Sequence, residues 1–316
     1  MALLAGSPMI EVQNLTKTFS IGKEKLTAVN NVSFQIEPGE ILGLVGESGC
    51  GKSTLGKLLV RLERPTEGKI FFEGKEISNS SDRHLCRKIQ MIFQDPFASL
   101  NPRMTVDALI REPLVVHRLP VGHIVEELLD LVGLPKNAAS RFPHEFSGGQ
   151  KQRIGIARAL ALKPQFLICD EPISALDVSI QAQIASLLQR LQKELNLTYL
   201  FIAHDLAMVR YLSTRIAVMY LGAFVEIAPS DMLFEKPLHP YTELLLASIH
   251  LPNPELERKR TRVFISGDPP SPLHPPPGCP FSTRCPKAMP ICRIERPKLV
   301  QIGEGHEVAC HLYDEL

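Results

Sequence analysis

Short apolar runs alternate with amphipathic helical patterns through most of the first 250 residues. Strands separated by helices predict a mainly parallel sheet that is covered on both faces. The predicted strands are residues 40–46, 166–171, 198–204 and 215–221, and predicted helices follow the first three of them at 52–62, 179–195 and 205–213. The pattern therefore indicates an α/β fold.

Three other apolar patterns have a period of two and are bounded by turn residues, which is typical of antiparallel strands. They cover residues 10–20, 28–36 and 68–77 and predict a separate antiparallel β subdomain. Between a further predicted strand at 88–94 and the strand at 166–171, residues 95–162 have a helical pattern that prolines interrupt. We expect a helical insertion there.

The composition changes after residue 250. Residues 251–316 hold 12 of the 26 prolines and four of the seven cysteines. We therefore predict a core domain over residues 9–250, which includes the helical subdomain at 95–162, and an appended Cys/Pro-rich C-terminal extension over 251–316.

Charge and hydropathy exclude some functions. Lys and Arg number 35 against 34 Asp and Glu, so the net charge of +1 provides no basic excess for binding nucleic acid. No apolar run is as long as the ~18 residues of a membrane span, and the first residues lack the pattern of a signal peptide. We expect a cytosolic chain, whose cysteines are buried thiols or metal ligands rather than disulfides.

One glycine-rich segment predicts a phosphate site, because it matches the pattern GxxxxGK[ST] between a predicted strand and a predicted helix. Glycines allow a tight turn whose backbone N–H groups face phosphate oxygens, and the helix N-terminus adds partial positive charge. Lys52 would reach the β and γ phosphates, and Ser53 would ligate Mg²⁺. The predicted ATP-binding residues of this loop are Gly46, Glu47, Ser48, Gly49, Cys50, Gly51, Lys52, Ser53 and Thr54.

Two acidic residues end the predicted strand at 166–171. Asp170 is a candidate for a water-mediated contact with Mg²⁺, and Glu171 is a candidate general base for the attacking water. Taken alone, these acids would equally serve to cap the next helix. Together with the phosphate loop they predict a nucleotide hydrolase.

Seven motifs together resemble the ATP-binding subunits of ABC transporters over about residues 9–250. In chain order they are an aromatic residue at Phe19, the phosphate loop, Gln94 in IFQDP, FSGGQ at 146–150, FLICDE at 166–171, SALD at 174–177 and His204 in IAHD. The resemblance implies a P-loop NTPase fold of the ABC ATPase type, with a mainly parallel core sheet, an antiparallel β subdomain and a helical subdomain. Because Glu171 and SGGQ are both intact, it also implies a catalytically competent subunit.

The resemblance assigns roles to single residues. Phe19 would stack on adenine, and Gln94 would contact Mg²⁺ and the attacking water. His204 would hydrogen-bond the γ-phosphate and orient Glu171. Two such subunits would pair head to tail, with Asp177 at the dimer contact. The residues of one subunit that would close over the γ-phosphate held by the other are Ser147, Gly148, Gly149 and Gln150.

The end of the chain narrows the resemblance to the ATP-binding subunits of dipeptide and oligopeptide importers, whose relatives also handle nickel and glutathione. Residues 239–249 and 267–285 carry this likeness. It implies a second ATP-binding subunit, expected to be a paralogue, two membrane permease subunits and an extracytoplasmic peptide-binding protein. The chain would lie peripherally on the cytoplasmic face of the inner membrane. The residues expected near the docking groove for a membrane subunit, or else in the core of the helical subdomain, are Phe93, Pro96, Phe97 and 99–106.

Four cysteines of the extension form a candidate metal site. Four thiolates can hold together a short segment that has little core of its own, through zinc or through an iron–sulfur cluster. The resemblance favours a [4Fe-4S] cluster, with zinc, or thiols without metal, as alternatives. The cysteines are Cys279, Cys285, Cys292 and Cys310, and the basic residues that would offset the charge of either metal group are Arg284, Lys287, Arg293 and Arg296.

Two other classes of function compete with the importer. Soluble ABC ATPases that act in translation or DNA repair usually carry two ABC sets or a long coiled-coil insertion, whereas this chain has one set and a short insertion. A regulatory or metal-sensing protein that does not hydrolyse ATP has no need of Glu171. The cargo and the identity of the partner ATPase lie outside the information in this chain.

Overall fold

The computed structural model describes residues 7–78, 80, 82–174, 176–248 and 270–314. The described chain divides into two compact units. As far as they are described, unit 1 takes in residues 1–35, 42–79 and 204–316, and unit 2 takes in residues 36–41 and 80–203.

Unit 1 contains an antiparallel sheet in the order β2-β1-β4-β5. Its strands are β1 (Ile10–Ile21), β2 (Glu24–Ile36), β4 (Glu67–Phe72) and β5 (Lys75–Glu76). On β1, Ile10 and Val12 point to the buried face, and they pair with the buried Phe72 and Ile70 of β4. This alternation is the period-two pattern of the sequence, and the predicted antiparallel β subdomain is confirmed.

A second group of strands in unit 1 has the order β11-β12-β10-β9-β3. The strands are β3 (Ile41–Val45), β9 (Arg215–Tyr220), β10 (Ala223–Pro229), β11 (Val300–Gln301) and β12 (Glu307–Val308). β3 and β9 are parallel, whereas β10 is antiparallel to β9 and to β12. All five residues of β3 are buried, as expected of a strand covered on both faces.

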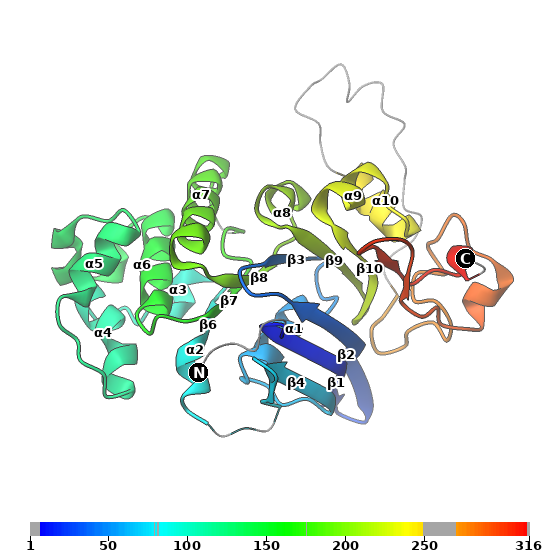
Figure 1. Cartoon of the computed structure of the whole chain (residues 1–316), viewed down its shortest axis with the longest axis horizontal. Helices are drawn as coiled ribbons and strands as arrows, with labels where there is room; N and C mark the ends of the chain where they lie inside the picture. Colours follow the sequence, from blue (N-terminus) through cyan, green and yellow to red (C-terminus); the bar gives the residue numbers. More distant parts are fainter. Residues whose placement is uncertain (1–6, 79, 81, 175, 249–269, 315–316) are drawn as a thin grey trace, which may run out of the picture. The chain divides into compact units, whose positions relative to one another are not determined.

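The helices of unit 1 cover these strands. Figure 1 shows α8, α9 and α10 together on one face of β3, β9 and β10. α1 is anchored by Leu55, Leu58 and Leu59, which are fully buried. The helices are α1 (Lys52–Leu59), α8 (Leu206–Leu212), α9 (Ser230–Glu235) and α10 (Pro240–Ala247), with 3₁₀ helices at Pro290–Arg293 and His311–Tyr313.

Unit 2 contains parallel strands in the order β8-β7-β6. They are β6 (Ile89–Ile92), β7 (Phe166–Asp170) and β8 (Thr198–Ile202). Every residue of β7 and β8 is buried. Because parallel strands end at the same edge, Asp170 at the end of β7 is in register with Ile202 at the end of β8.

Helices connect the strands of unit 2, and the segment between β6 and β7 is helical as predicted. Figure 1 shows α4, α5 and α6 beside one another in this unit. Their shared core includes Leu109, Leu129 and Ile154, which are fully buried. The helices are α2 (Leu85–Lys88), α3 (Pro96–Ser99), α4 (Val106–Val116), α5 (Ile124–Leu131), α6 (Gly148–Leu160) and α7 (Val178–Leu195), with 3₁₀ helices at Lys136–Ser140 and Pro143–Glu145.

The C-terminal extension continues the sheet of unit 1. Val308 of β12 pairs with Glu226 of β10, and the Ala309 N–H donates to the Val225 carbonyl at 2.8 Å. Val308 also packs with Leu238 in a small buried cluster. The composition of the extension did not indicate this pairing, because two-residue strands leave no periodic pattern.

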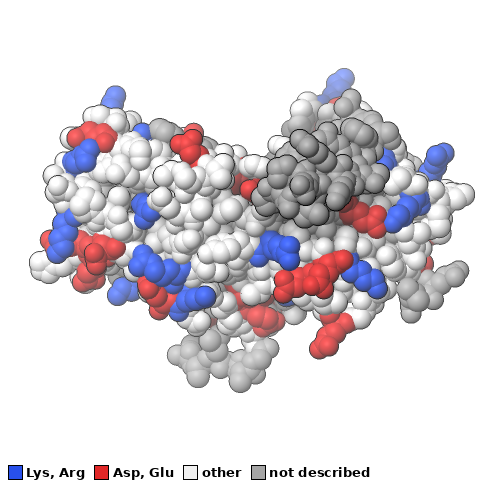
Figure 2. Space-filling model, turned by 90° about the horizontal axis from the view of Figure 1, so that it is seen from above, with Lys and Arg blue, Asp and Glu red and all other residues white. Residues whose placement is uncertain are grey.

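Charged residues of both signs are interspersed on the face shown in Figure 2. This mixture agrees with the net charge of +1. Among the described residues in this view, the charges form no broad basic patch of the kind that nucleic-acid binding uses.

Candidate functional site

The phosphate loop joins β3 to α1, and two glycines determine its path. Gly46 has a φ of 153° and Gly51 a φ of 110°. A Cβ atom would lie 2.2 Å from the Met219 carbonyl oxygen at the first position and 2.1 Å from the Ala28 carbonyl oxygen at the second. Side chains are therefore excluded at both positions, and the loop keeps the bare backbone that lets N–H groups approach an anion closely.

Lys52 is the first residue of α1 and is only 4% exposed. Its Nζ donates to the Gly46 carbonyl at 2.8 Å and to the Glu47 carbonyl at 3.1 Å. Its ammonium group thus lies within the loop, where phosphate oxygens would be bound. Ser53 and Thr54 follow in the first turn of α1, and both are half-buried.

The acids at the end of β7 lie in different environments. Asp170 is 4% exposed, whereas Glu171 is half-buried and has a left-handed φ of 44°. The Glu171 N–H donates to the Ile202 carbonyl at 2.9 Å, which fixes this conformation against β8. Gln94, two residues after β6, donates from Nε2 to Glu171 Oε2 at 2.9 Å. Unit 2 therefore brings together two of the predicted catalytic residues.

Ser147 caps the N-terminus of α6 and is exposed. Its Oγ accepts a hydrogen bond from the Gln150 N–H at 3.4 Å, and its own N–H donates to Gln150 Oε1 at 3.0 Å. Gly149 is buried. A Cβ atom there would lie 2.4 Å from Ile180 Cγ2, so a side chain does not fit. The segment thus presents the N-terminus of a 13-residue helix at the surface, where its partial positive charge favours an anion.

Three other predicted residues are placed as follows. Phe19 on β1 is half-buried, with Lys17 Nζ 4.7 Å from the centre of its ring. His204 follows β8 in the chain and is exposed. Asp177 is the exposed N-cap residue of α7, and its carbonyl accepts hydrogen bonds from the backbone of the first turn.

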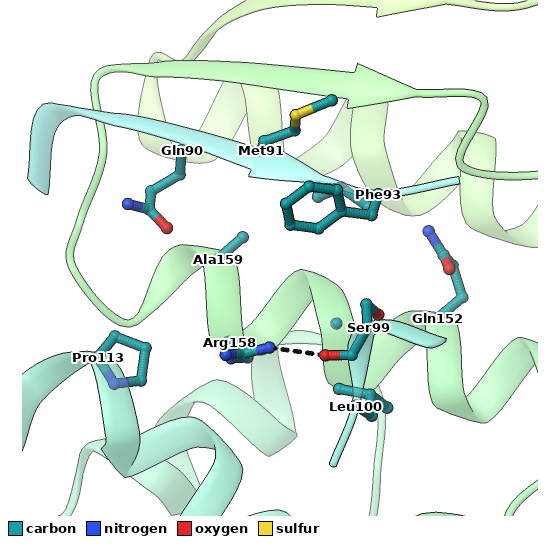
Figure 3. Close-up of a pocket in the computed structure, with 11 residues that line it drawn as sticks. Gln90, Met91, Phe93, Ser99, Leu100, Pro113, Gln152, Arg158 and Ala159 are labelled. Carbon is teal, nitrogen blue, oxygen red and sulfur yellow. Dashed lines mark hydrogen bonds between the residues drawn. The ribbon is translucent and has the colours of Figure 1, made fainter. Parts of the chain in front are cut away.

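Unit 2 also contains a cavity of about 150 Å³ between β6 and helices α3, α4 and α6. Figure 3 shows Phe93, Pro113 and Arg158 around it. Arg158 donates to the Ser99 carbonyl at 2.9 Å and to Glu112 Oε2 at 2.7 Å, and Phe93 is 43% exposed. Phe93 and Ser99, two residues of the docking prediction, line this cavity, and docking of a membrane subunit there stays a prediction; the side chains of Pro96 and Phe97 lie outside the described residues.

Comparisons with known proteins identify the chain. Two family models match it, one described as ABC transporter over residues 29–174 and one described as oligopeptide/dipeptide transporter, C-terminal region, over residues 225–292. The ATP-binding protein YkfD of Bacillus subtilis (strain 168) is 57% identical over 315 residues, which cover 97% of this chain and 96% of the relative. The chain belongs to the ABC transporter family.

Other relatives agree with this assignment. The oligopeptide transport ATP-binding protein AppF of Bacillus subtilis (strain 168) is 54% identical over 294 residues, covering 90% of this ABC chain and 89% of the relative. A dimeric post-hydrolysis structure of the ATP-binding cassette MJ0796 bound to ADP and Pi is 31% identical, with a TM-score of 0.64, and covers 70% of this chain and 99% of that chain. The predicted ABC ATPase fold is confirmed.

The prediction of an iron–sulfur or other metal site in the extension is wrong. Among the residues that the structure describes, which include all four cysteines, no group of three or more His, Cys, Asp or Glu side chains is placed to hold a metal ion. The names of the relatives mention no such group either. Burial raises the pKa of Cys279 and of Cys310 to about 11, so both thiols are protonated near neutral pH.

The surroundings of the cysteines explain the error. Cys292 Sγ accepts a hydrogen bond from the Met289 N–H at 3.4 Å, and Cys310 packs in the apolar cluster with Val308. Two of the cations that were expected to offset a metal group are paired with carboxylates instead, Arg284 with Glu47 and Lys287 with Glu243. Cys279, Cys292 and Cys310 are therefore small buried side chains of the extension, and Cys285 is half-buried.

The sequence reasoning missed one contact of the phosphate loop. Arg284 of the extension forms two hydrogen bonds with the Glu47 carboxylate, and the Glu47 N–H donates to the Tyr241 hydroxyl at 2.9 Å. Arg284 and Glu47 are 237 positions apart. No local pattern predicts a pair at such a separation, although both residues lay in segments that the motifs singled out.

Within the described ranges, none of the helices combines the length and the hydrophobicity that crossing a bilayer requires.

Proposed function

We propose that this ABC chain binds and hydrolyses ATP to drive the import of oligopeptides or dipeptides across the cytoplasmic membrane. The hydrogen bond between Gln94 and Glu171 is the observation that best supports ATP hydrolysis. It holds the amide proposed to contact the attacking water beside the carboxylate proposed to be its general base, at the end of β7. The match of the C-terminal region to oligopeptide/dipeptide transporters and the name of AppF support peptides as the cargo. We also propose the division into an ATPase domain at 9–250, with its helical subdomain at 95–162, and an extension at 251–316.

The phosphate loop would bind the phosphates of ATP. Lys52 is positioned for this, because its ammonium group already bonds to carbonyls of the loop and would exchange them for β- and γ-phosphate oxygens. Phe19 would stack on adenine through its ring. The residues proposed to contribute backbone or side-chain contacts to the nucleotide are Gly46, Glu47, Ser48, Gly49, Cys50, Gly51, Ser53 and Thr54.

The donors near these motifs suit Mg²⁺. The Ser53 hydroxyl, the Gln94 amide oxygen and the buried Asp170 carboxylate are oxygen ligands, which this hard cation prefers. When bound, the ion would neutralise charge on the β and γ phosphates.

Glu171 would accept a proton from the attacking water. Its left-handed backbone, held by the Ile202 carbonyl, and the bond from Gln94 restrict the directions its carboxylate takes. A residue held in this way orients the water without reorganising first. His204 would hydrogen-bond the γ-phosphate from the chain that follows β8.

The exposed N-terminus of α6 would act on a nucleotide held by a second ATP-binding subunit, proposed to be a paralogue. Ser147, Gly148 and Gly149 would supply donors to its γ-phosphate, with Gln150 retained in the capping box that shapes the turn. Asp177 would lie at the dimer contact. ATP would then hold the two subunits together until it is hydrolysed.

Two membrane permease subunits and an extracytoplasmic peptide-binding protein would complete the transporter, with this chain peripheral to the cytoplasmic face of the membrane. The cavity beside Phe93 would receive a cytoplasmic helix of a permease subunit. Its position supports this, because Phe93 directly precedes Gln94, whose bond to Glu171 would change with the nucleotide.

The ATPase part is tested by Glu171→Gln. This variant keeps the shape of the side chain but removes the base, so ATP turnover should fall by on the order of 10² or more while ATP binding is retained. With ATP and the partner subunits present, it should also accumulate as a dimer on gel filtration. Glu194→Gln, at an exposed position of α7, is the matched control and should turn over ATP like the parent chain. Unchanged turnover in the first variant would refute the role of Glu171.

The cargo is tested in liposomes that contain this chain, its partner ATPase and the two permease subunits. A binding protein loaded with an oligopeptide should stimulate ATP hydrolysis and move labelled peptide into the vesicles. Stimulation by nickel or by glutathione, with none by peptides, would replace the proposed cargo but leave the ATPase role intact.

A further inference from the structure

Arg284 of the extension binds the side chain of Glu47 in the phosphate loop with both arms of its guanidinium group. The distances are 2.9 Å from Nη1 to Oε2 and 3.0 Å from Nη2 to Oε1. The Arg284 side chain is 6% exposed and that of Glu47 is 25% exposed. Parallel bonds of this kind are the strongest form of ion pair and fix the geometry of both groups.

Three aromatic residues that contact one another, Tyr220, Tyr241 and Phe281, form an aromatic group beside the pair. Arg284 Nη1 also donates to the Tyr220 hydroxyl at 3.2 Å, and the Tyr241 hydroxyl accepts from the Glu47 N–H at 2.9 Å. The ring of Phe281 lies 5.3 Å, between centroids, from each of the two tyrosine rings. Because water is largely excluded here, the ion pair is screened less than one at the surface.

The need to attach the extension does not explain this pair, because other contacts already attach it. β12 already pairs with β10, His306 of the extension bonds to the buried Glu226, and Lys287 bonds to Glu243. These contacts all lie away from the phosphate loop in the sequence. Arg284 differs from them because its partner is a residue of the loop itself.

The charge of Glu47 gives the pair its significance. A free carboxylate in a loop that binds phosphates would repel them, most strongly where water is excluded. Arg284 neutralises this charge and holds the carboxylate against the aromatic group. We propose that Arg284 is a positioning residue for nucleotide binding, so that the C-terminal extension forms part of the ATP site. This inference rests on the proposed binding of ATP by the loop.

The test is ATP affinity, measured by titration of the full chain with a fluorescent ATP analogue, for Arg284→Met, Glu47→Gln and the double variant. The loss of a charged, bidentate pair should weaken ATP binding by roughly tenfold or more in Arg284→Met. The double variant should recover most of the affinity that Arg284→Met loses, because Glu47→Gln removes the unpaired charge. Higher salt should partly restore Arg284→Met alone, since it screens repulsion.

Lys287→Met is the matched control, because it removes another ion pair of the extension, at an exposed position outside the loop. It should leave ATP affinity unchanged. Arg284→Lys, which keeps the charge but not the parallel bonds, provides a second variant if Arg284→Met does not fold, and it should weaken ATP binding clearly less than the loss expected of Arg284→Met.

Several outcomes would overturn the inference. They are a folded Arg284→Met chain that binds ATP like the parent, a loss that Glu47→Gln does not relieve, and a loss in Arg284→Lys as large as that expected of Arg284→Met. A parent chain that does not bind ATP would refute the proposed function itself. The two failures are therefore distinguishable.

Discussion

Replacing His306 by leucine should weaken the attachment of the extension to β10 within unit 1. His306 is 3% exposed, and its Nε2 lies 2.7 Å from Oε1 of Glu226, which is fully buried in β10. The Glu226 carboxylate also accepts from the Leu238 N–H at 2.8 Å and from the His239 N–H at 2.9 Å. Leucine would fill a similar volume but would supply no hydrogen-bond donor to this carboxylate.

The magnitude follows from the partners that remain. Leaving a buried acceptor without one of its hydrogen-bond donors costs about 1–3 kcal/mol, and more where the acceptor is a carboxylate. The two backbone donors still hold the Glu226 carboxylate, so we expect about 3 kcal/mol. For a unit of this size that corresponds to a fall in Tm of about 6–12 °C.

Scanning calorimetry of the full chain would measure the fall. His306→Gln keeps an N–H donor and should lose clearly less than His306→Leu. Lys136→Met breaks an exposed ion pair with Glu126 and should leave Tm unchanged. If His306→Leu melts within about 2 °C of the parent chain, the buried pair does not hold the extension in place.

Two further predictions concern the loop and the core. Gly51→Ala would place a Cβ atom 2.1 Å from the Ala28 carbonyl oxygen at a φ of 110°, so it should abolish ATP binding in the titration used above, whereas an unchanged affinity would contradict the loop geometry. Burial lowers the pKa of His239 to about 4, partly opposed by Glu226, so the folded chain keeps this imidazole neutral. The contribution of this neutral imidazole to the free energy of unfolding should be complete above about pH 6.5. As the pH falls towards 4, the free energy of unfolding should drop by about 3 kcal/mol. Urea unfolding at pH 7 and pH 4.5 should show this loss in the parent chain and a smaller one in His239→Asn; equal losses would refute it.

The parts of the fold and site that sequence could predict are those governed by neighbouring residues. The period of two in β1 and the apolar run Phe166–Cys169 of β7 follow from which faces are buried. The bare turn at Gly46 and the serine cap at Ser147 follow from local backbone needs, and the structure has both. The bond from Gln94 to Glu171 was not predicted, since the ends of β6 and β7 meet only through sheet pairing.

The four cysteines show where such reasoning fails. Spacing and composition cannot distinguish protonated thiols packed in a small core from thiolates around a metal, because both need several cysteines in a short segment. The difference lies in the neighbours, which pack Cys310 against Val308 and raise its pKa by burial. The nearby cations also serve other partners, as Lys287 does with Glu243.

The pairing of Arg284 with Glu47 indicates that the extension acts in the phosphate loop rather than at a metal site. A segment held only by β12 and by the His306 pair would need no arginine at 6% exposure pointing into the phosphate loop. Burying a guanidinium group is costly unless its partner repays the lost hydration, and here the partner is a carboxylate that the loop needs neutralised. If that is the reason for Arg284, removing Glu47 and Arg284 together should cost the chain less in ATP affinity than removing Arg284 alone. A purely structural anchor would instead leave the ATP affinity of a folded Arg284→Met chain unchanged, because its loss would appear only in the free energy of unfolding.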